Sequence, residues 1–436
     1  MRDIKMTEST PRLLHLSLGS QASILATLGR TATIVQHLRQ FVRFVFESLQ
    51  GQKSTQLSHN LRGGERKTKS TRTQEAFADA VDHEIRLLDK WCAAREETMC
   101  RAWGGTGTFG DADDDRLVIS LLRTEKDVRD TFERTFEVLL VLTREIFPLS
   151  TGSTRRGICP AAISAALLDR LFESVQEHLE RREKITSEAL MRVFVRTAEP
   201  VWDMLGRWLR DGMGLGVGIG PGNADSVRDL EEEFFIESSG LGLGMMGVGL
   251  LDPEFWKEGY TLRERVVLEG GDKGDGRNEK SSKVVPLFLE HVAELALGAG
   301  KAIGLLRALE VPLSSITPNE GDWRPFSHLI GPFSTSPSGA RLDLTCSQKT
   351  NGDLLLSVSI DTLSRLIYDE LLPRCTAADT LLVDVLVKEC NLWKHLESME
   401  DLFLMKKGDA MSHFADILFA KVCSDLSRYL DQSLLF

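Results

Sequence analysis

Apolar side chains recur at three- and four-residue spacing along most of this chain, which predicts amphipathic α-helices. The clearest run follows Pro160, a residue type that is favoured in the first turn of a helix. Its apolar positions are Ile163, Leu167, Leu171, Val175 and Leu179. Because strand-like alternation is nearly absent, the chain is expected to fold as an all-α protein rather than around a sheet.

A second helical stretch surrounds Pro200. Phe194 and Ala198 lead up to this proline, and we expect the helix to end there because proline has no backbone N–H to donate. A new helix then presents on one face Val201, Leu205, Trp208 and Leu209. Gly212 follows this face and is well placed to end the helix.

The segment after Pro286 also has helical spacing. Its apolar positions are Leu289, Val292, Ala296, Ala299, Ile303 and Leu306. Gly298, Gly300 and Gly304 lie among them and would weaken an exposed helix. We therefore expect another helix or loop to pack closely against this segment.

Two more helices are predicted near the carboxyl end of the chain. One continuous apolar stripe comprises Leu382, Leu386, Trp393, Leu396, Met399 and Phe403. The next comprises Phe414, Ile417, Leu418, Val422, Leu426 and Leu430. The turn between them contains Gly408 and Asp409, which we expect to supply a C-terminal glycine and then a capping carboxylate.

Long polar or glycine-rich segments separate these helices and are expected to be disordered or irregular insertions. They cover residues 50–72, 212–226, 238–250, 270–283 and 313–352. Only Leu354 to Ile360 alternates as a strand would, and one strand cannot form a sheet. The predicted organisation is a helical region over residues 1–312, a flexible linker or insertion over 313–357 and a second helical region over 358–436.

Charge and cysteine placement exclude several classes of protein. The net charge is −11, whereas a general nucleic-acid binder needs a positive surface. The one basic stretch, residues 62–72, has no interleaved aromatic side chains and is expected to be a solvated linker. The seven cysteines form no C-x-x-C pair, which favours a reducing compartment. No apolar run of 18 residues and no signal-peptide pattern occurs, so we predict a cytoplasmic protein that neither spans a membrane nor is secreted.

Glycine patterns of the form G-x-G-x-x-G occur at residues 105–110 and 242–247. A dinucleotide site needs a strand before such a pattern and a helix after it. Aspartates within residues 111–115 follow the first pattern and would repel a phosphate, and no strand precedes the second. Both patterns are therefore expected to be loops, and the aspartates are expected to cap a helix beginning near Arg116.

A metal site is not expected either. His291 and Glu294 share a helical face, but no second histidine completes an H-E-x-x-H pattern. No nucleophile elbow, Walker loop or kinase signature is present. The sequence therefore predicts a protein that is not an enzyme and that needs no cofactor.

An ordered series of motifs extends over roughly 340 residues, from Thr73 to Phe414. It begins with T-Q-E-A-F at 73–77 and P-V-W-D-M-L-G-R-W-L-R-D-G at 200–212, which ends in Trp208 and Gly212. The next motifs are E-E-F-F-I, with Phe234 and Phe235, and F-W-K-E-G-Y-T-L-R, with Phe255, Trp256 and Tyr260. The last are V-P-L-F-L…G-K, with Pro286, Gly300 and Lys301, and F-L-M-K-K-G-D-A-M-S-H-F, with Gly408, Asp409 and Phe414.

In this order the motifs resemble the gamma-tubulin ring complex component family, also called spindle pole body components. The T-Q-E-A-F motif and the glycine-rich insertions are most similar to the minor fifth and sixth components. The aromatic residues of the motifs are expected to pin an irregular segment onto neighbouring helices, with core burial favoured over direct contact with a partner.

The resemblance implies an elongated stack of helical bundles that acts as a scaffold. In this family the N-terminal half, here residues 1–312, associates laterally with sister components, and the C-terminal half holds gamma-tubulin. Side-by-side packing forms a template for microtubule nucleation, because pre-organised subunits have a high effective concentration. The implied location is the cytoplasm and cytoskeleton, at microtubule-organising centres and spindle poles, with a role in mitotic spindle assembly.

The implied partners are sister components, gamma-tubulin and, indirectly, microtubule minus ends, with no nucleic acid and no membrane. The chain stops at Phe436, about two helices into the family's second grip region, so we expect it to retain mainly the lateral-association half. Two other functions stay open. One is a generic helical adaptor unrelated to microtubules, and the other is a nucleotide-dependent enzyme that uses one of the glycine patterns.

Overall fold

The computed structural model describes residues 4, 7, 10–12, 16–55, 70–104, 120–147, 159–213, 232–239, 257–264, 283–312, 323–330, 360–404 and 406–433. Side chains are described in these ranges except at 48–55, 102–104 and 424–433. The chain divides into two compact units, Met1–Cys375 and Thr376–Phe436. We call them unit 1 and unit 2, and their boundary lies within one helix.

Helices make up nearly all of the described chain, which confirms the all-α prediction. The elements of unit 1 are α1 (Leu18–Thr55), α2 (Arg72–Gly104), α3 (Leu121–Val128), the π-helical turn η1 (Arg129–Glu133), α4 (Arg134–Ile146), α5 (Pro160–Glu180), α6 (Lys184–Asp211), β1 (Ile236–Ser238), β2 (Tyr260–Leu262), the 3-10 turn η3 (Leu287–Leu289), α9 (Glu290–Ala308), α10 (Phe326–Leu329) and the first half of α12 (Ile360–Lys388). Unit 2 has the rest of α12, then α13 (Leu392–Phe403) and α14 (Gly408–Ser433).

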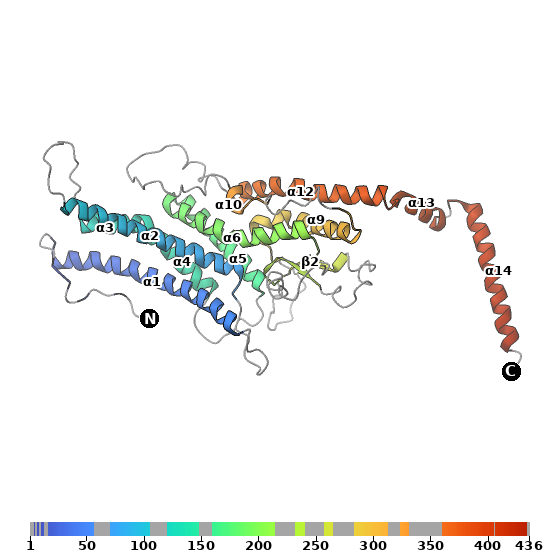
Figure 1. Cartoon of the computed structure of the whole chain (residues 1–436), viewed down its shortest axis with the longest axis horizontal. Helices are drawn as coiled ribbons and strands as arrows, with labels where there is room; N and C mark the ends of the chain where they lie inside the picture. Colours follow the sequence, from blue (N-terminus) through green and yellow to red (C-terminus); the bar gives the residue numbers. More distant parts are fainter. Residues whose placement is uncertain are drawn as a thin grey trace, which may run out of the picture. The chain divides into compact units, whose positions relative to one another are not determined.

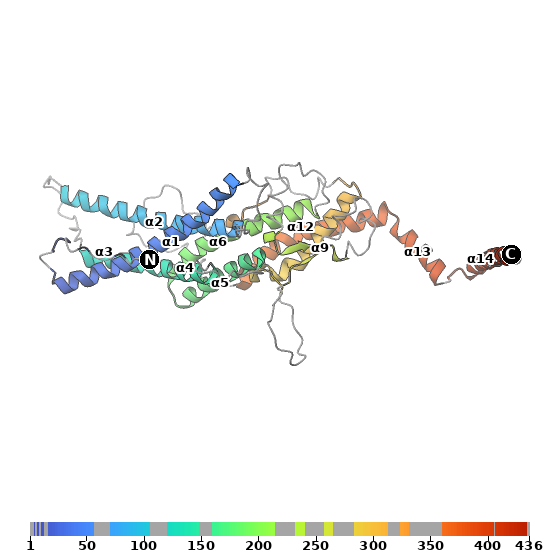
Figure 2. The same ribbon diagram turned by 90° about the horizontal axis from the view of Figure 1, so that it is seen from below.

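Helix α6 is the central element of unit 1. It packs against α2, α5, α9 and α10 (Figure 1). Its buried positions extend from Thr186 to Leu209, as expected for a helix covered on several sides. In the second view α9 and α12 lie side by side (Figure 2), and the ring N–H of His291 donates to the Ser364 carbonyl oxygen at 2.7 Å.

The expected helix break at Pro200 is wrong. Helix α6 continues through this proline. Residues on both sides of it are deeply buried, with Ala198 fully covered and Trp202 only 2% exposed. Burial along the whole helix outweighs the roughly 3 kcal/mol that a proline in a helix interior costs.

An ion pair with a buried carboxylate joins α2 to α6. Arg192 donates from Nε and Nη2 to the two carboxylate oxygens of Glu84, at 3.0 and 2.9 Å. Burial acts to lower the pKa of Arg192, but the hydrogen bonds and charge of Glu84 outweigh it and the pKa is raised. The two-pronged geometry fixes the register of α2 on α6.

An aromatic core lies where α5, α6, η3 and α10 meet. Its rings belong to Phe172, Phe194, Trp202, Phe288 and Phe326. Phe326 is fully buried although it falls within the predicted linker over 313–357. The described part of that range, residues 323–330, includes α10, which packs on α6. The limits of the linker itself stay a prediction.

In unit 2, the stripe predicted as one helix is divided between two. Backbone N–H groups of Glu389 and Cys390 both turn back to the Val385 carbonyl, which ends α12. Asn391 then adopts a left-handed conformation, with φ 50°, before α13 begins. Asparagine tolerates this conformation better than most residues, so it separates the two helices at small cost.

The turn between α13 and α14 also differs from expectation. Gly408 was expected as a C-terminal glycine, but it is the first residue of α14. Helix α13 ends at Phe403, and the N–H of Leu404 closes its last turn on the Glu400 carbonyl at 3.0 Å. Asp409 does lie in the first turn of α14, where a carboxylate is favourable.

A two-stranded ribbon was not anticipated. Strands β1 and β2 are antiparallel and pair Ile236 with Leu262 and Ser238 with Tyr260. Three residues per strand are too few to show alternation in the sequence. Several predicted features lie outside the described residues: both glycine patterns, the aspartates at 111–115, the basic residues before Ser70, and residues 354–359 of the alternating segment.

Candidate functional site

The motif residues of unit 1 converge at the end of α6. Trp208 packs against Gly300 of α9, and its indole N–H donates to the Ala296 carbonyl at 2.8 Å. A Cβ atom at Gly300 would lie 2.1 Å from the Trp208 ring. Only glycine fits at that position, so the glycine of the G-K motif is explained by the tryptophan of the W-L-R-D-G motif.

Gly212 ends α6 against the same helix. Its φ is +65°, and a Cβ atom there would lie 2.6 Å from the backbone nitrogen of Gly304. The next residue, Met213, donates its N–H to the Gly300 carbonyl at 3.3 Å and packs on Gly304. The expectation of close packing is therefore met at Gly300 and Gly304 but not at Gly298, which has nothing within 4 Å of an added Cβ.

Aromatic side chains in the β1–β2 ribbon and just before it join this site. The ring centroid of Trp208 lies 6.3 Å from that of Phe234 and 5.4 Å from that of Tyr260. The ring centroids of Phe234 and Phe235 are 4.4 Å apart. Both phenylalanines are buried, and Tyr260 is half-buried. Lys301, next to Gly300, donates to the Lys257 carbonyl at 2.9 Å and so ties α9 to the segment just before β2.

We call this set the motif junction: Trp208, Gly212, Phe234, Phe235, Tyr260, Gly300 and Lys301. Partial burial lowers the pKa of Lys301, with the nearby Glu294 acting the other way. Phe255 and Trp256 lie outside the described residues. Pro286 precedes η3 on the opposite end of α9, and Gly408, Asp409 and Phe414 belong to unit 2.

A buried carboxylate beside the junction holds the start of α2. Glu233, only 4% exposed, accepts the backbone N–H groups of Arg72 and Thr73, both at 2.8 Å. It also accepts the hydroxyl of Ser164 on α5 at 2.9 Å. The E-E-F-F-I segment thus caps a helix that begins 160 residues earlier, and the orphan N–H groups of α2 are satisfied.

Two other helices receive similar caps from a distance. Glu199 on α6 accepts the N–H groups of Phe326 and Ser327 at the start of α10, at 3.0 and 3.3 Å. Asp169 on α5 accepts the N–H of Leu287 at 2.8 Å, just before α9. Burial raises the pKa of both carboxyl groups, that of Asp169 to about 6, against the opposing effect of these hydrogen bonds.

The contacts of the junction fix the ends of several helices in place. The junction is packed with rings and glycines, and its polar atoms are used in fixed backbone contacts. Among the described residues, no group of three or more His, Cys, Asp or Glu could hold a metal ion. Within the same residues, no helix has the length and apolar character to cross a membrane.

Sequence reasoning identified the junction residues but missed the three capping carboxylates and the Glu84–Arg192 pair. Glu233 belongs to the quoted E-E-F-F-I motif, yet nothing in its sequence neighbourhood indicates that it reaches residue 72. Contacts between residues this far apart along the chain leave no periodic signal.

Comparison with protein families identifies one family over most of the chain. The model for the N-terminal part of gamma tubulin complex components matches residues 2–389. That range holds the motif junction, the three capping carboxylates and all of α12. A search of curated proteins returns no significant match.

Proposed function

Because this chain belongs to the gamma tubulin complex component family, we propose that it is a structural subunit of the gamma-tubulin ring complex. The observation that carries the proposal is the family match over residues 2–389. The family is one of structural scaffolds rather than a class of enzymes. A scaffolding role accords with a site made of packed rings and capped helices.

We further propose that unit 1 associates laterally with sister components, and that the minor fifth and sixth components are the members it resembles most. In the assembled ring the chain would help to hold gamma-tubulin molecules side by side for microtubule nucleation. A scaffold of this kind needs fixed geometry, because effective concentration falls when the spacing of bound subunits varies. Caps from Glu233, Glu199 and Asp169 supply such rigidity, since each ties two distant elements together.

The corresponding cellular location is the cytoskeleton at microtubule-organising centres, including spindle poles, with a role in mitotic spindle assembly. Gamma-tubulin would reach this chain through the assembled ring, in which sister components bind it.

Purification of the tagged full chain from cells tests the proposal. Sister components and gamma-tubulin, quantified by mass spectrometry, are expected to co-purify with the wild-type chain and with Gly298→Ala. Gly300→Ala is expected to recover less of both, because the added methyl group would meet the Trp208 ring. Recovery of neither partner by the wild-type chain would remove the proposed function.

A further inference from the structure

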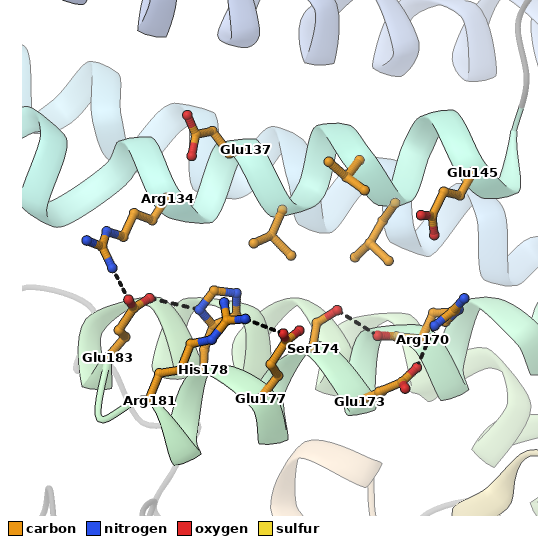
Figure 3. A pocket seen from close by; sticks show the side chains of 13 residues that line it. Arg134, Glu137, Glu145, Arg170, Glu173, Ser174, Glu177, His178, Arg181 and Glu183 are labelled. Carbon is orange, nitrogen blue, oxygen red and sulfur yellow. Dashed lines mark hydrogen bonds and ion pairs between the residues drawn. The ribbon is translucent and has the colours of Figure 1, made fainter.

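Helices α4 and α5 leave an open groove between them in unit 1 (Figure 3). Its volume is about 580 Å³. Val138, Val141 and Leu142 of α4 contribute aliphatic side chains to it. Val141 is 53% exposed although it lies between two helices. The described residues therefore leave about half of the apolar surface of this valine side chain uncovered.

Charged side chains form the rim of this groove. On the α5 side they are paired with one another or with α4, as Figure 3 shows: Arg170 with Glu173, Arg181 with Glu177, and both Arg134 and His178 with Glu183. On the α4 side the carboxylates of Glu137 and Glu145 form no ion pair with any described residue. Glu145 is near enough to Arg170 to contribute, after Glu173, to the raised pKa of that guanidinium.

The two unpaired carboxylates have a defined spacing. Glu137 and Glu145 are eight residues apart on α4, so they lie about 12 Å from each other along the helix axis. The aliphatic residues of the groove fall between them in sequence. A negative charge, an apolar stretch and a second negative charge therefore follow one another along this wall.

We propose that the α4–α5 groove docks an amphipathic helix of a partner protein, with two basic residues about two turns apart on either side of an apolar stripe. Helix-in-groove docking buries apolar anchors, while flanking charges set the register and orientation. The rim excludes a phosphate-rich or anionic-lipid surface, because its unpaired groups are carboxylates. This inference goes beyond ring membership, since it names the chemistry of a partner helix rather than the complex.

Fluorescence anisotropy with designed helical peptides tests the proposal on the full chain. Each peptide has one apolar stripe and two lysines, placed about one, two or three turns apart. A fourth peptide has glutamates in place of the lysines at the two-turn spacing. We expect saturable binding that is tightest for the two-turn lysine peptide, that weakens with added salt, and that is lost for the glutamate peptide.

Variants of the groove locate the binding site. Val141→Glu is expected to weaken binding of the two-turn peptide about tenfold or more, because it places a charge in the apolar contact. Glu137→Gln with Glu145→Gln is expected to weaken it severalfold and to reduce its salt dependence. The matched control is Val383→Glu, since Val383 is 57% exposed on α12 outside the groove, and it should leave binding unchanged.

Four results would each overturn the proposal. They are no binding of any lysine peptide, equal binding of the lysine and glutamate peptides, equal effects of Val141→Glu and Val383→Glu, and a dimer of the wild-type chain that Val141→Glu converts to a monomer. The last would assign the groove to self-association. The Gln double variant keeps the test valid if Val141→Glu fails to fold.

Discussion

Unit 1 and unit 2 use the same sequence pattern in different ways. Trp208 in unit 1 is 8% exposed and contacts α9 and the β1–β2 ribbon. Trp393 in unit 2 is 66% exposed, and α13 has no buried residue at all. Helix α14 also presents its apolar stripe to solvent: Phe414, Ile417, Leu418, Phe419 and Val422 are all exposed.

The difference shows that helical periodicity predicts a helix but not the burial of its apolar face. In unit 1 the apolar stripes of α5, α6 and α9 are buried against other elements, so their residues contribute to stability. In unit 2 the described apolar side chains of α13 and α14 are exposed, and exposed apolar side chains gathered on a helix are typical of an interaction surface. Substitutions should therefore have large effects in unit 1 and small effects at matched positions in unit 2.

The largest contrast is expected between the two tryptophans. Trp208→Ala should lower the free energy of unfolding by about 3–5 kcal/mol, because it removes a buried ring and a hydrogen bond to Ala296. Trp393→Ala should change it by less than about 0.5 kcal/mol. Urea denaturation followed by circular dichroism measures both. Equal losses of unfolding free energy in the two variants would contradict the distinction between buried apolar faces in unit 1 and exposed ones in unit 2.

Glycine substitutions give the next contrast. Gly300→Ala should cost about 3 kcal/mol, because its methyl group would overlap the Trp208 ring. Gly408→Ala in unit 2 has open space and should be neutral or stabilise the chain by up to about 1 kcal/mol. Thermal unfolding of both variants measures these changes in stability. A stabilising effect of Gly300→Ala would show that the junction is loosely packed.

Substitution of a carboxylate at a helix start should also cost more stability in unit 1 than in unit 2. Glu233→Gln keeps the shape of the side chain but replaces one acceptor oxygen by an amide donor beside Arg72 and Thr73. We expect a loss of about 2–3 kcal/mol in the free energy of unfolding. Asp409→Asn at the exposed start of α14 should cost less than about 1 kcal/mol. If both variants unfold at the same urea concentration, the distant cap contributes no more than a local one.

The smallest expected effect depends on pH. Burial raises the pKa of Asp169 from 3.8 to about 6, so the folded chain holds this proton more tightly than the unfolded chain. Its contribution is fully present below pH 4 and is lost as the pH rises through 6. Relative to Asp169→Asn, the wild-type chain should lose about 2 kcal/mol between pH 4 and pH 7.5.

The exposed Asp379 of unit 2 provides the matched carboxyl group. Partial burial raises its pKa, and a smaller loss in the same direction is expected against Asp379→Asn. Unfolding free energies at several pH values measure both pairs. A wild-type chain that gains stability over Asp169→Asn as the pH rises would contradict the direction of the Asp169 shift.

The parts of the fold that the sequence predicts are those with local causes. Helices α5 and α9 follow from their apolar spacing, and the glycines of α9 indicated a close neighbour. The identity of that neighbour, Trp208, does not follow, because it lies about ninety residues away along the chain. Gly298 has the same local setting as Gly300 but no neighbour, so the pattern alone could not tell the two apart.

Three features depend on balances that a single sequence does not reveal. Pro200 was expected to end a helix, but burial on both sides of it outweighs the missing hydrogen bond. Asn391 divides a stripe that looks continuous, since its left-handed conformation leaves the apolar spacing unchanged. The cap from Glu233 requires chain segments 160 residues apart to meet. Each is decided by tertiary contacts rather than by local preference.

Hydrogen–deuterium exchange of the intact chain tests most directly whether the apolar helix faces are buried in unit 1 and exposed in unit 2. Backbone amides of α6 and α9 should exchange only by global unfolding, because their helices are buried on several sides. Amides of α13 and α14 should exchange orders of magnitude faster. Protection of α13 and α14 equal to that of α9 would contradict the account, since it would require their exposed apolar faces to be covered.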